Sequence, residues 1–185
     1  GIDGVFDIAF SDGSVAALAP SLGGEAADVR DLSGLHVFPG LIDLHTHVYW
    51  GGTFLGVDAT MLAARSGMTT AVDAGSAGAA NIRGLLEQCA PMTPARILAF
   101  INLAVTGIFV DEGRITMDEA EDLRLLDIQH CVDAAKRHRQ SVVGVKIRVG
   151  ASTTKHLGAM PLHMAVRAGE LAGLPVMVHI GAGMP

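Results

Sequence analysis

The sequence is poor in cysteine and aromatic residues and has no long hydrophobic run, and each shortage narrows the class of protein. Its two cysteines, Cys89 and Cys131, fall in helix-like segments without metal-ligand spacing, so we interpret them as reduced core thiols. No apolar run is long enough to span a bilayer, and no segment resembles a signal peptide. We therefore expect a cytoplasmic protein without a membrane partner.

Positive charge is also scarce. The chain has 13 Lys and Arg against 19 Asp and Glu, a formal net charge of −6, and its basic residues form no cluster. This balance argues against nucleic acid or an anionic membrane as a partner. In contrast, 50% of the 185 residues are hydrophobic and 23 are glycine, which predicts a globular core with many tight connections between strands and helices.

Residues 1–38 have the pattern of β structure. Asp12 and Gly13 have the composition of a hairpin turn between two alternating segments. The expected extended segments are 5–10, 15–19, 27–32 and 36–38. Hairpin-like segments of this size cannot bury a face of their own, so we interpret 1–38 as part of a small β domain.

From Pro39 onward the pattern changes to alternating strands and helices. The expected strands are 41–47, 69–73, 97–103, 142–149 and 175–180, and the expected helices are 59–66, 79–89, 117–139 and 160–172. Such alternation predicts an α/β fold with a parallel sheet, either an open doubly wound sheet or a (β/α)₈ TIM barrel.

Two observations favour the barrel. No Gly-x-Gly-x-x-Gly follows the first of these strands and no Walker-type loop is present, which weakens the case for a nucleotide-binding open sheet. Polar residues also stand at the carboxyl ends of several strands, where a barrel has its active site. These residues are His45, His47, Asp73, Asn102, Lys146, Arg148 and His179.

The strongest local signal is the end of the first of these strands, where His45 and His47 are separated by one residue. Residues i and i+2 of a strand point to the same side, so the two imidazoles aim at one point. Asp43 shares their parity, and we expect it to orient a ring or to add an oxygen ligand. This pattern predicts half of a divalent-metal site for zinc, iron or manganese, and the alternative is an ordinary strand with a polar end.

Lys146 and Arg148 share one side of an otherwise apolar strand. A buried lysine must become neutral, form a pair or be modified, and the alternative is that both side chains reach the rim or pair with an acid. A single histidine such as His179 at a strand end is more often a core residue than a ligand. Its occurrence together with the His-x-His pair and Lys146 nevertheless favours a metal site.

The segment 39–47 resembles the first motif of the amidohydrolase superfamily of metal-dependent hydrolases. The resemblance implies two divalent metal ions, preferentially zinc, with His45 and His47 on the more buried one and His179 on the second. It also implies that Lys146 is carbamylated by CO₂ and bridges both metals. In this comparison residues 39–185 are the first five βα units of the barrel, and residues 1–38 are part of a small β-sandwich.

Finer features resemble the deacetylase-like, dihydroorotase-like subgroup of that superfamily. The stretches concerned are 50–53, 72–78 with Asn81, and 144–148. Dihydroorotases carry an arginine two residues after the second histidine to hold the substrate carboxylate, but this chain has Tyr49 there. Arg148 is a substitute anchor for an anionic substrate, or else pairs with an acid of the core.

The resemblance implies hydrolysis of an amide or ester bond in a small acylated, anionic substrate through a hydroxide that bridges the metals. A cyclic-amide hydrolase of the hydantoinase or dihydroorotase kind and a non-catalytic scaffold are the alternatives. The superfamily also has a histidine at the end of strand six and an aspartate at the end of strand eight. Both are expected outside this chain, and so is the general base. The chain therefore reads as the N-terminal portion of a longer enzyme, and we expect a homo-oligomer.

Overall fold

The structure, a computed structural model, describes residues 2–109, 118–181 and 183. The chain divides into two compact units, Gly1–Phe38 and Pro39–Pro185. Each unit is described by itself.

The first unit contains an antiparallel hairpin of β1 (Asp7–Ser11) and β2 (Ser14–Ala19). Asp12 and Gly13 have φ values of 52° and 76°, the left-handed backbone that a tight two-residue hairpin turn requires. The hairpin prediction is thus confirmed.

The strand character expected for 27–32 and 36–38 is wrong, because neither segment forms a strand. Polar side chains bond locally in the first of these segments. Arg30 Nε donates to Asp28, and the Ser33 amide donates to Asp31 at 2.9 Å. Short polar side chains that bond to nearby groups favour turns over ladder pairing.

The second unit is built on a parallel five-stranded sheet, so the α/β class is confirmed. Its strands are β3 (Leu41–Thr46), β4 (Met68–Gly78), β5 (Arg96–Asn102), β6 (Val142–Val149) and β7 (Val176–Ile180). The order in space is β3-β4-β5-β6-β7, the same as the order in sequence. A doubly wound sheet reverses its strand order at a switch point, whereas this sheet does not reverse across its five strands.

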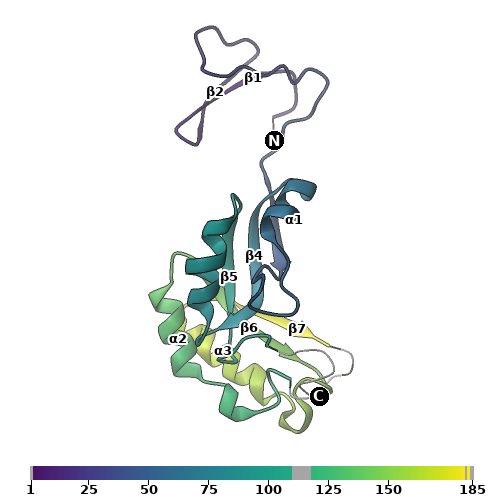
Figure 1. The fold of residues 1–185 in the computed structure, drawn as a ribbon, viewed down its shortest axis with the longest axis vertical. Helices are drawn as coiled ribbons and strands as arrows, with labels where there is room; N and C mark the ends of the chain where they lie inside the picture. Colours follow the sequence, from purple (N-terminus) through teal and green to yellow (C-terminus); the bar gives the residue numbers. More distant parts are fainter. Residues whose placement is uncertain (1, 110–117, 182, 184–185) are drawn as a thin grey trace. The chain divides into compact units, whose positions relative to one another are not determined.

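Among the described residues, three α-helices connect the strands: α1 (Ala59–Ser66), α2 (Ile128–Arg137) and α3 (Met160–Ala172). Figure 1 shows α2 and α3 side by side, and they pack on β5, β6 and β7. Short helical turns complete the connections: η1 (Gly84–Cys89), η2 (Ala90–Met92), η3 (Leu123–Leu125) and η4 (Lys155–Leu157).

The core of this unit lies between the sheet and its helices. Its fully buried side chains are mostly small or β-branched, including Ala71, Ala99, Ile101, Val145, Ile147, Cys131, Ala135, Ala165 and Ala168. Alanines on both helices let the helix backbones approach the sheet closely. This packing fixes the strand ends at which the polar residues stand.

The long helix expected at 117–139 is wrong over its first half. Residue 117 lies outside the described residues, residues 118–122 form no helix, and α2 begins only at Ile128. Along this stretch, aspartate side chains accept hydrogen bonds from nearby backbone amides. Asp122 accepts from the Arg124 amide at 2.8 Å, and Asp127 accepts from the His130 amide at 2.9 Å as the N-cap of α2. Such side-chain bonds offer the backbone an alternative to the helix.

Two further elements differ from the expectation. The strand expected at 69–73 continues to Gly78 and pairs there with Asn102 of β5. The helix expected at 79–89 is mainly the π-helical turn η1, a geometry that is rare and occurs often at functional sites. Both differences lie in the part of the sequence that follows Asp73, one of the polar residues expected at a strand end.

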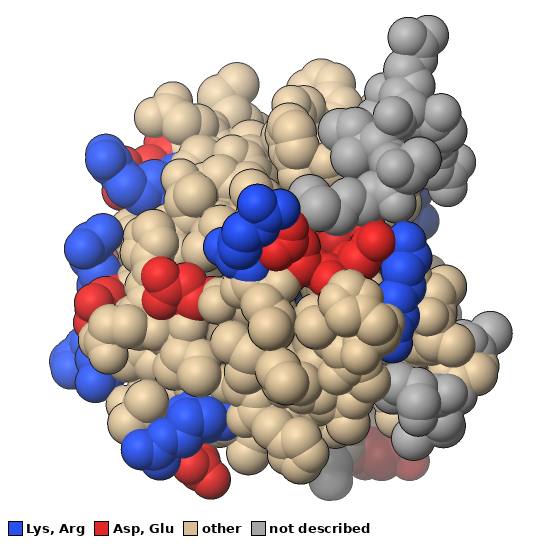
Figure 2. Space-filling view, turned by 90° about the horizontal axis from the view of Figure 1, so that it is seen from below, with Lys and Arg blue, Asp and Glu red and all other residues tan. Residues whose placement is uncertain are grey.

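The surface of the described chain mixes the two signs of charge. Figure 2 shows acidic and basic side chains next to one another on a face that is otherwise uncharged. Exposed pairs such as Arg83–Glu87 and Arg167–Glu170 contribute to this mixture. None of the helices in the described ranges combines the length and the apolar character needed to cross a bilayer.

Candidate functional site

The carboxyl edge of the sheet brings together residues from its first and last strands. The ring centroid of His45, on β3, lies 5.6 Å from that of His47 and 6.2 Å from that of His179, on β7. In a flat sheet, outer strands four spacings apart would be separated by about 19 Å. The sheet is therefore curled into a half-barrel, and the three rings meet on its inner side.

His47 is the most constrained of the three histidines. Its Nδ1 lies 2.9 Å from Ser76 Oγ at the end of β4. Burial, together with the charges of His45 and Lys146, lowers the pKa of His47 to about 4. The ring is accordingly neutral near pH 7, which is the state that binds a metal.

His45 and His179 are more exposed than His47. Burial and the Lys146 charge lower the pKa of both. One oxygen of the Asp43 carboxylate accepts a hydrogen bond from the His45 backbone amide at 3.0 Å. The role expected for Asp43 from its parity stays a prediction.

Lys146 lies on β6 with only 2% of its surface exposed. Its Nζ has no hydrogen-bond partner among the residues that the structure describes. Burial lowers its pKa, and the charge of Glu119 opposes that shift. A buried amine without a partner is costly, so this position calls for neutralisation, a ligand or covalent modification.

Gly75 explains how the long Lys146 side chain fits inside the sheet. Gly75 has a φ of 86°, and a Cβ added there would lie 2.8 Å from the Lys146 Cβ. Asn102, fully buried on β5, donates from Nδ2 to the Gly75 carbonyl at 3.0 Å and accepts from the Ala104 amide at 2.9 Å. Asn102 thus holds the backbone over which Lys146 passes.

Asp73 and Ser76 tie the end of β4 to the segment that follows β3. Asp73 accepts from the Val48 amide at 2.8 Å and from the Ser76 amide at 2.7 Å. The sequence placed Asp73 at a strand end, but the contact of Ser76 with His47 was missed. The one feature of the sequence that could have indicated this contact is that Ser76 is a polar residue within a run of small residues.

Arg148 faces acids rather than an open site. Its guanidinium pairs with Asp118, and its Nε lies 3.3 Å from an oxygen of Glu119. Glu119 is 2% exposed, and burial raises its pKa to about 8. Nearby, Lys155 pairs with Glu121 at 2.7 Å. Arg148 therefore has the acidic partners foreseen in the pairing alternative.

Tyr49 occupies a slot between its own loop and η1. Its hydroxyl donates to the Asn81 carbonyl at 3.3 Å, and a side chain at either Gly52 or Gly84 would overlap the ring. Asn81 in turn donates to the Thr106 carbonyl at 2.9 Å. Tyr49 thus joins the loops that follow β3, β4 and β5, and it is held by this packing.

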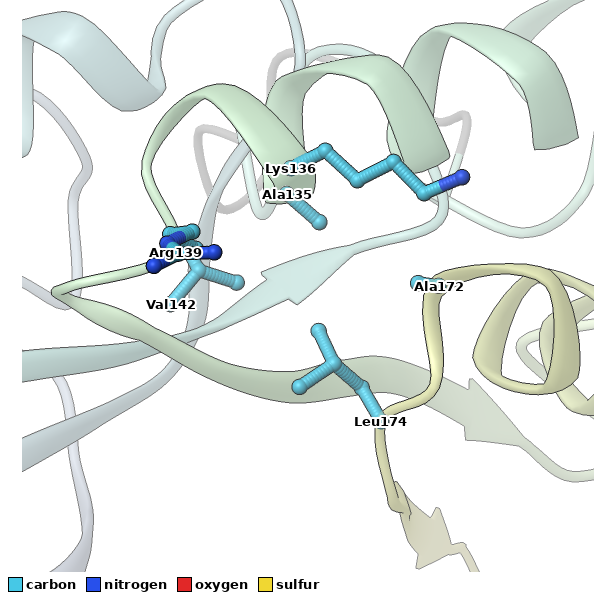
Figure 3. Close-up of a pocket in the computed structure, with 6 residues that line it drawn as sticks. All are labelled: Ala135, Lys136, Arg139, Val142, Ala172 and Leu174. Atoms are coloured by element: carbon cyan, nitrogen blue, oxygen red, sulfur yellow. The ribbon is translucent and has the colours of Figure 1, made fainter.

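One cavity of the second unit lies away from this edge. Figure 3 shows a cavity of about 390 Å³ at the amino ends of β6 and β7, lined by Ala135, Lys136, Arg139, Val142, Ala172 and Leu174. Active sites of parallel barrels lie at the opposite, carboxyl edge. Within the described ranges, no three His, Cys, Asp or Glu side chains are already arranged to hold a metal ion.

Comparison with known proteins gives consistent matches. A sequence profile of the amidohydrolase family matches residues 36–184. Over 171 residues the chain is 34% identical to a deacetylase of Brucella anthropi and 33% identical to a deacetylase of Agrobacterium fabrum. These alignments cover 92% of this chain and 42% and 41% of those proteins.

A solved structure shows the same arrangement. The crystal structure of a dihydroorotase matches with a TM-score of 0.85 and 31% identity, over 98% of this chain and 48% of that chain. The chain thus spans less than half the length of these two deacetylases and of this dihydroorotase.

We expect Gly75→Ala to destabilise the full-length protein more than Gly67→Ala. Both glycines have left-handed backbone, but a Cβ at Gly67 meets nothing within 4 Å, whereas one at Gly75 meets Lys146. Gly67→Ala should cost about 1–2 kcal/mol of unfolding free energy from its backbone alone. Gly75→Ala should exceed that cost in denaturant titrations, and an equal cost would show that the Lys146 contact is easily relieved.

Proposed function

We propose, from the premise that this chain belongs to the amidohydrolase family, that the full-length protein is a metal-dependent hydrolase acting on an amide or ester bond of a small acylated substrate. One observation carries the proposal. Three histidine rings from the two outer strands of the sheet gather at its carboxyl edge, where the buried Lys146 also stands.

The donor set fits divalent metal ions. Imidazole suits zinc, iron and manganese sites, and the lowered pKa values of His45, His47 and His179 favour the neutral rings that bind metal. Lys146 fits only after conversion, because an ammonium repels cations and a neutral amine bridges nothing. A carbamate formed from CO₂ would give Lys146 two anionic oxygens in place of an unpartnered amine.

We propose His45, His47, His179 and carbamylated Lys146 as ligands of two divalent ions, preferentially zinc. When bound, such ions polarise the scissile carbonyl and lower the pKa of water toward neutrality. The chain's own residues orient this chemistry. Ser76 fixes one nitrogen of His47, Asn102 and Gly75 shape the space around Lys146, and Asp73 anchors the backbone that follows His47.

We further propose that residues 39–185 are the first five units of a closed (β/α)₈ barrel and that residues 1–38 are part of a small β-sandwich. The unreversed strand order, the curl of the sheet and the likeness to the dihydroorotase support this proposal. The general base is then expected on a later strand. The cytoplasmic location and the homo-oligomeric state remain predictions from the sequence.

Among substrates, the deacetylase-named relatives support an acylated small molecule, preferably anionic. A cyclic-amide hydrolase is the second candidate, because of the likeness to a dihydroorotase. Tyr49 speaks against the second candidate, since it replaces the arginine of dihydroorotases and its ring is enclosed by glycines. The presence of all four proposed metal ligands argues against a non-catalytic scaffold.

The metal proposal predicts that purified full-length protein contains about two divalent ions per chain by elemental analysis. The double variant His45→Ala/His47→Ala should lose at least the more buried ion, because its two imidazole donors are gone. His163→Ala, which removes an imidazole from α3 rather than from the strand ends, is the matched control and should keep both ions. Unchanged metal content in the double variant would rule out this ligand assignment.

The carbamate proposal predicts that Lys146→Ala loses the second ion and the activity, since no bridging anion remains. A short carboxylic acid such as acetate or propionate should restore part of the activity by supplying two oxygens in the vacated space. High-resolution electron density of the metal-loaded full-length enzyme should show the added carboxyl group on Nζ. An unmodified amine in an active, metal-loaded crystal would end this proposal.

For Arg148 we propose that a substrate carboxylate exchanges with one of its acidic partners. Arg148→Met should then raise KM for N-acetylated amino acids about 10- to 100-fold, with much less effect on their neutral amides. Lys155→Met is the control, because it removes another paired cation of the same rim. Equal effects of Arg148→Met on acidic and neutral substrates would instead assign Arg148 to holding Asp118 and Glu119.

A further inference from the structure

We propose that Ser76 and Asp73 are positioning residues that fix the tautomer and the orientation of the His47 ring, so that Nε2 is the nitrogen offered to a metal ion. This inference rests on the proposed function and adds two residues to it. The geometry that carries it is a chain of contacts from His47 through Ser76 to Asp73.

The first contact assigns the two nitrogens of His47. Ser76 Oγ lies 2.9 Å from Nδ1, so Nδ1 already has a partner inside the protein. A neutral imidazole carries one proton, and the nitrogen that binds a metal must be the other one. A proton on Nδ1, donated to Ser76 Oγ, leaves the lone pair on Nε2.

The second contact places Ser76 next to the Asp73 carboxylate. A hydroxyl can donate or accept, so Ser76 alone would permit either tautomer of His47. The Asp73 carboxylate accepts a hydrogen bond from the Ser76 backbone amide at 2.7 Å, which holds this serine next to the carboxylate. In the proposed arrangement the hydroxyl proton of Ser76 turns to this carboxylate, so that Ser76 accepts from Nδ1–H of His47.

The burial of both residues makes this arrangement rigid. Asp73 and Ser76 each have 0% exposed surface, so water does not compete for their hydrogen bonds. The backbone of Ser76 is itself held, because its carbonyl accepts from the Ile108 amide at 3.2 Å. Asp73 also accepts from the amide of Val48, the residue after His47. Ser76 therefore holds the ring of His47, and Asp73 holds the backbone that follows it.

The expected loss of metal affinity follows from the general behaviour of metal sites. Partners that hold the second nitrogen of a metal-binding histidine are worth about 10- to 100-fold in metal affinity. We expect Ser76→Ala in the full-length protein to weaken zinc binding by that factor in competition with a chelator. Cobalt substitution should also show a changed visible absorption spectrum, because the His47 ring is no longer held in one orientation.

Two further variants separate positioning from simple stability. Ser76→Thr keeps the hydroxyl and should retain most of the zinc affinity. Thr154→Val removes another fully buried hydroxyl, whose hydrogen bond among the described residues goes to the Gly150 carbonyl at 3.1 Å and not to a proposed ligand. Its zinc affinity and cobalt spectrum should be those of the wild type, even if its melting temperature falls.

The decisive observation needs no variant. A crystal structure of the zinc-loaded full-length protein should show the metal on Nε2 of His47 and Ser76 Oγ on Nδ1. Zinc on Nδ1, or wild-type affinity and spectrum in a folded Ser76→Ala variant, would overturn this inference and leave the proposed function intact. A wild-type protein that binds no divalent metal would overturn the proposed function and this inference together.

Discussion

The curl of the parallel sheet is the constraint on which the rest of the structure depends. Without it, the histidines of β3 and β7 would be separated by four strand spacings. The 6.2 Å between the ring centroids of His45 and His179 requires the two outer strands to turn toward each other. The twist of neighbouring strands supplies the curl, and small buried residues such as Ala71 and Ala99 let the helices follow it. The same curl creates the inner side on which Lys146 is enclosed.

Burial on the inner side of the sheet then sets the pKa values of the groups that stand there. The inner side lowers the pKa of the three histidines and of Lys146, which favours groups that bind cations over groups that carry positive charge. Next to these groups, the Arg148 guanidinium pairs with Asp118, and its Nε lies 3.3 Å from an oxygen of Glu119. One edge of a single sheet thus carries three imidazoles of lowered pKa and, next to them, the ion pair of Arg148 with Asp118.

The local sequence was sufficient to predict the bounds of a helix or strand where a single periodicity and a clear stop signal agreed. The bounds of β6 and α3 match the expectation residue for residue, because an apolar run and an apolar helix with a following glycine leave few alternatives. It failed where aspartates bond to nearby amides, as before α2, and where a π-helical turn replaced a regular helix. Parity predicted that His45 and His47 converge, but the Ser76 contact depends on how two different loops meet, which no local pattern contains.

The glycine slot around Tyr49 has a consequence for how this protein can vary. Gly52 and Gly84 have no room for a side chain while the ring of Tyr49 is present, and a smaller residue at 49 would leave a void of the size of that ring. The three positions therefore form one epistatic unit, in which the tolerance of each depends on the other two. Directed evolution toward new substrates should randomise them jointly, because single-site libraries sample only the destabilised intermediates.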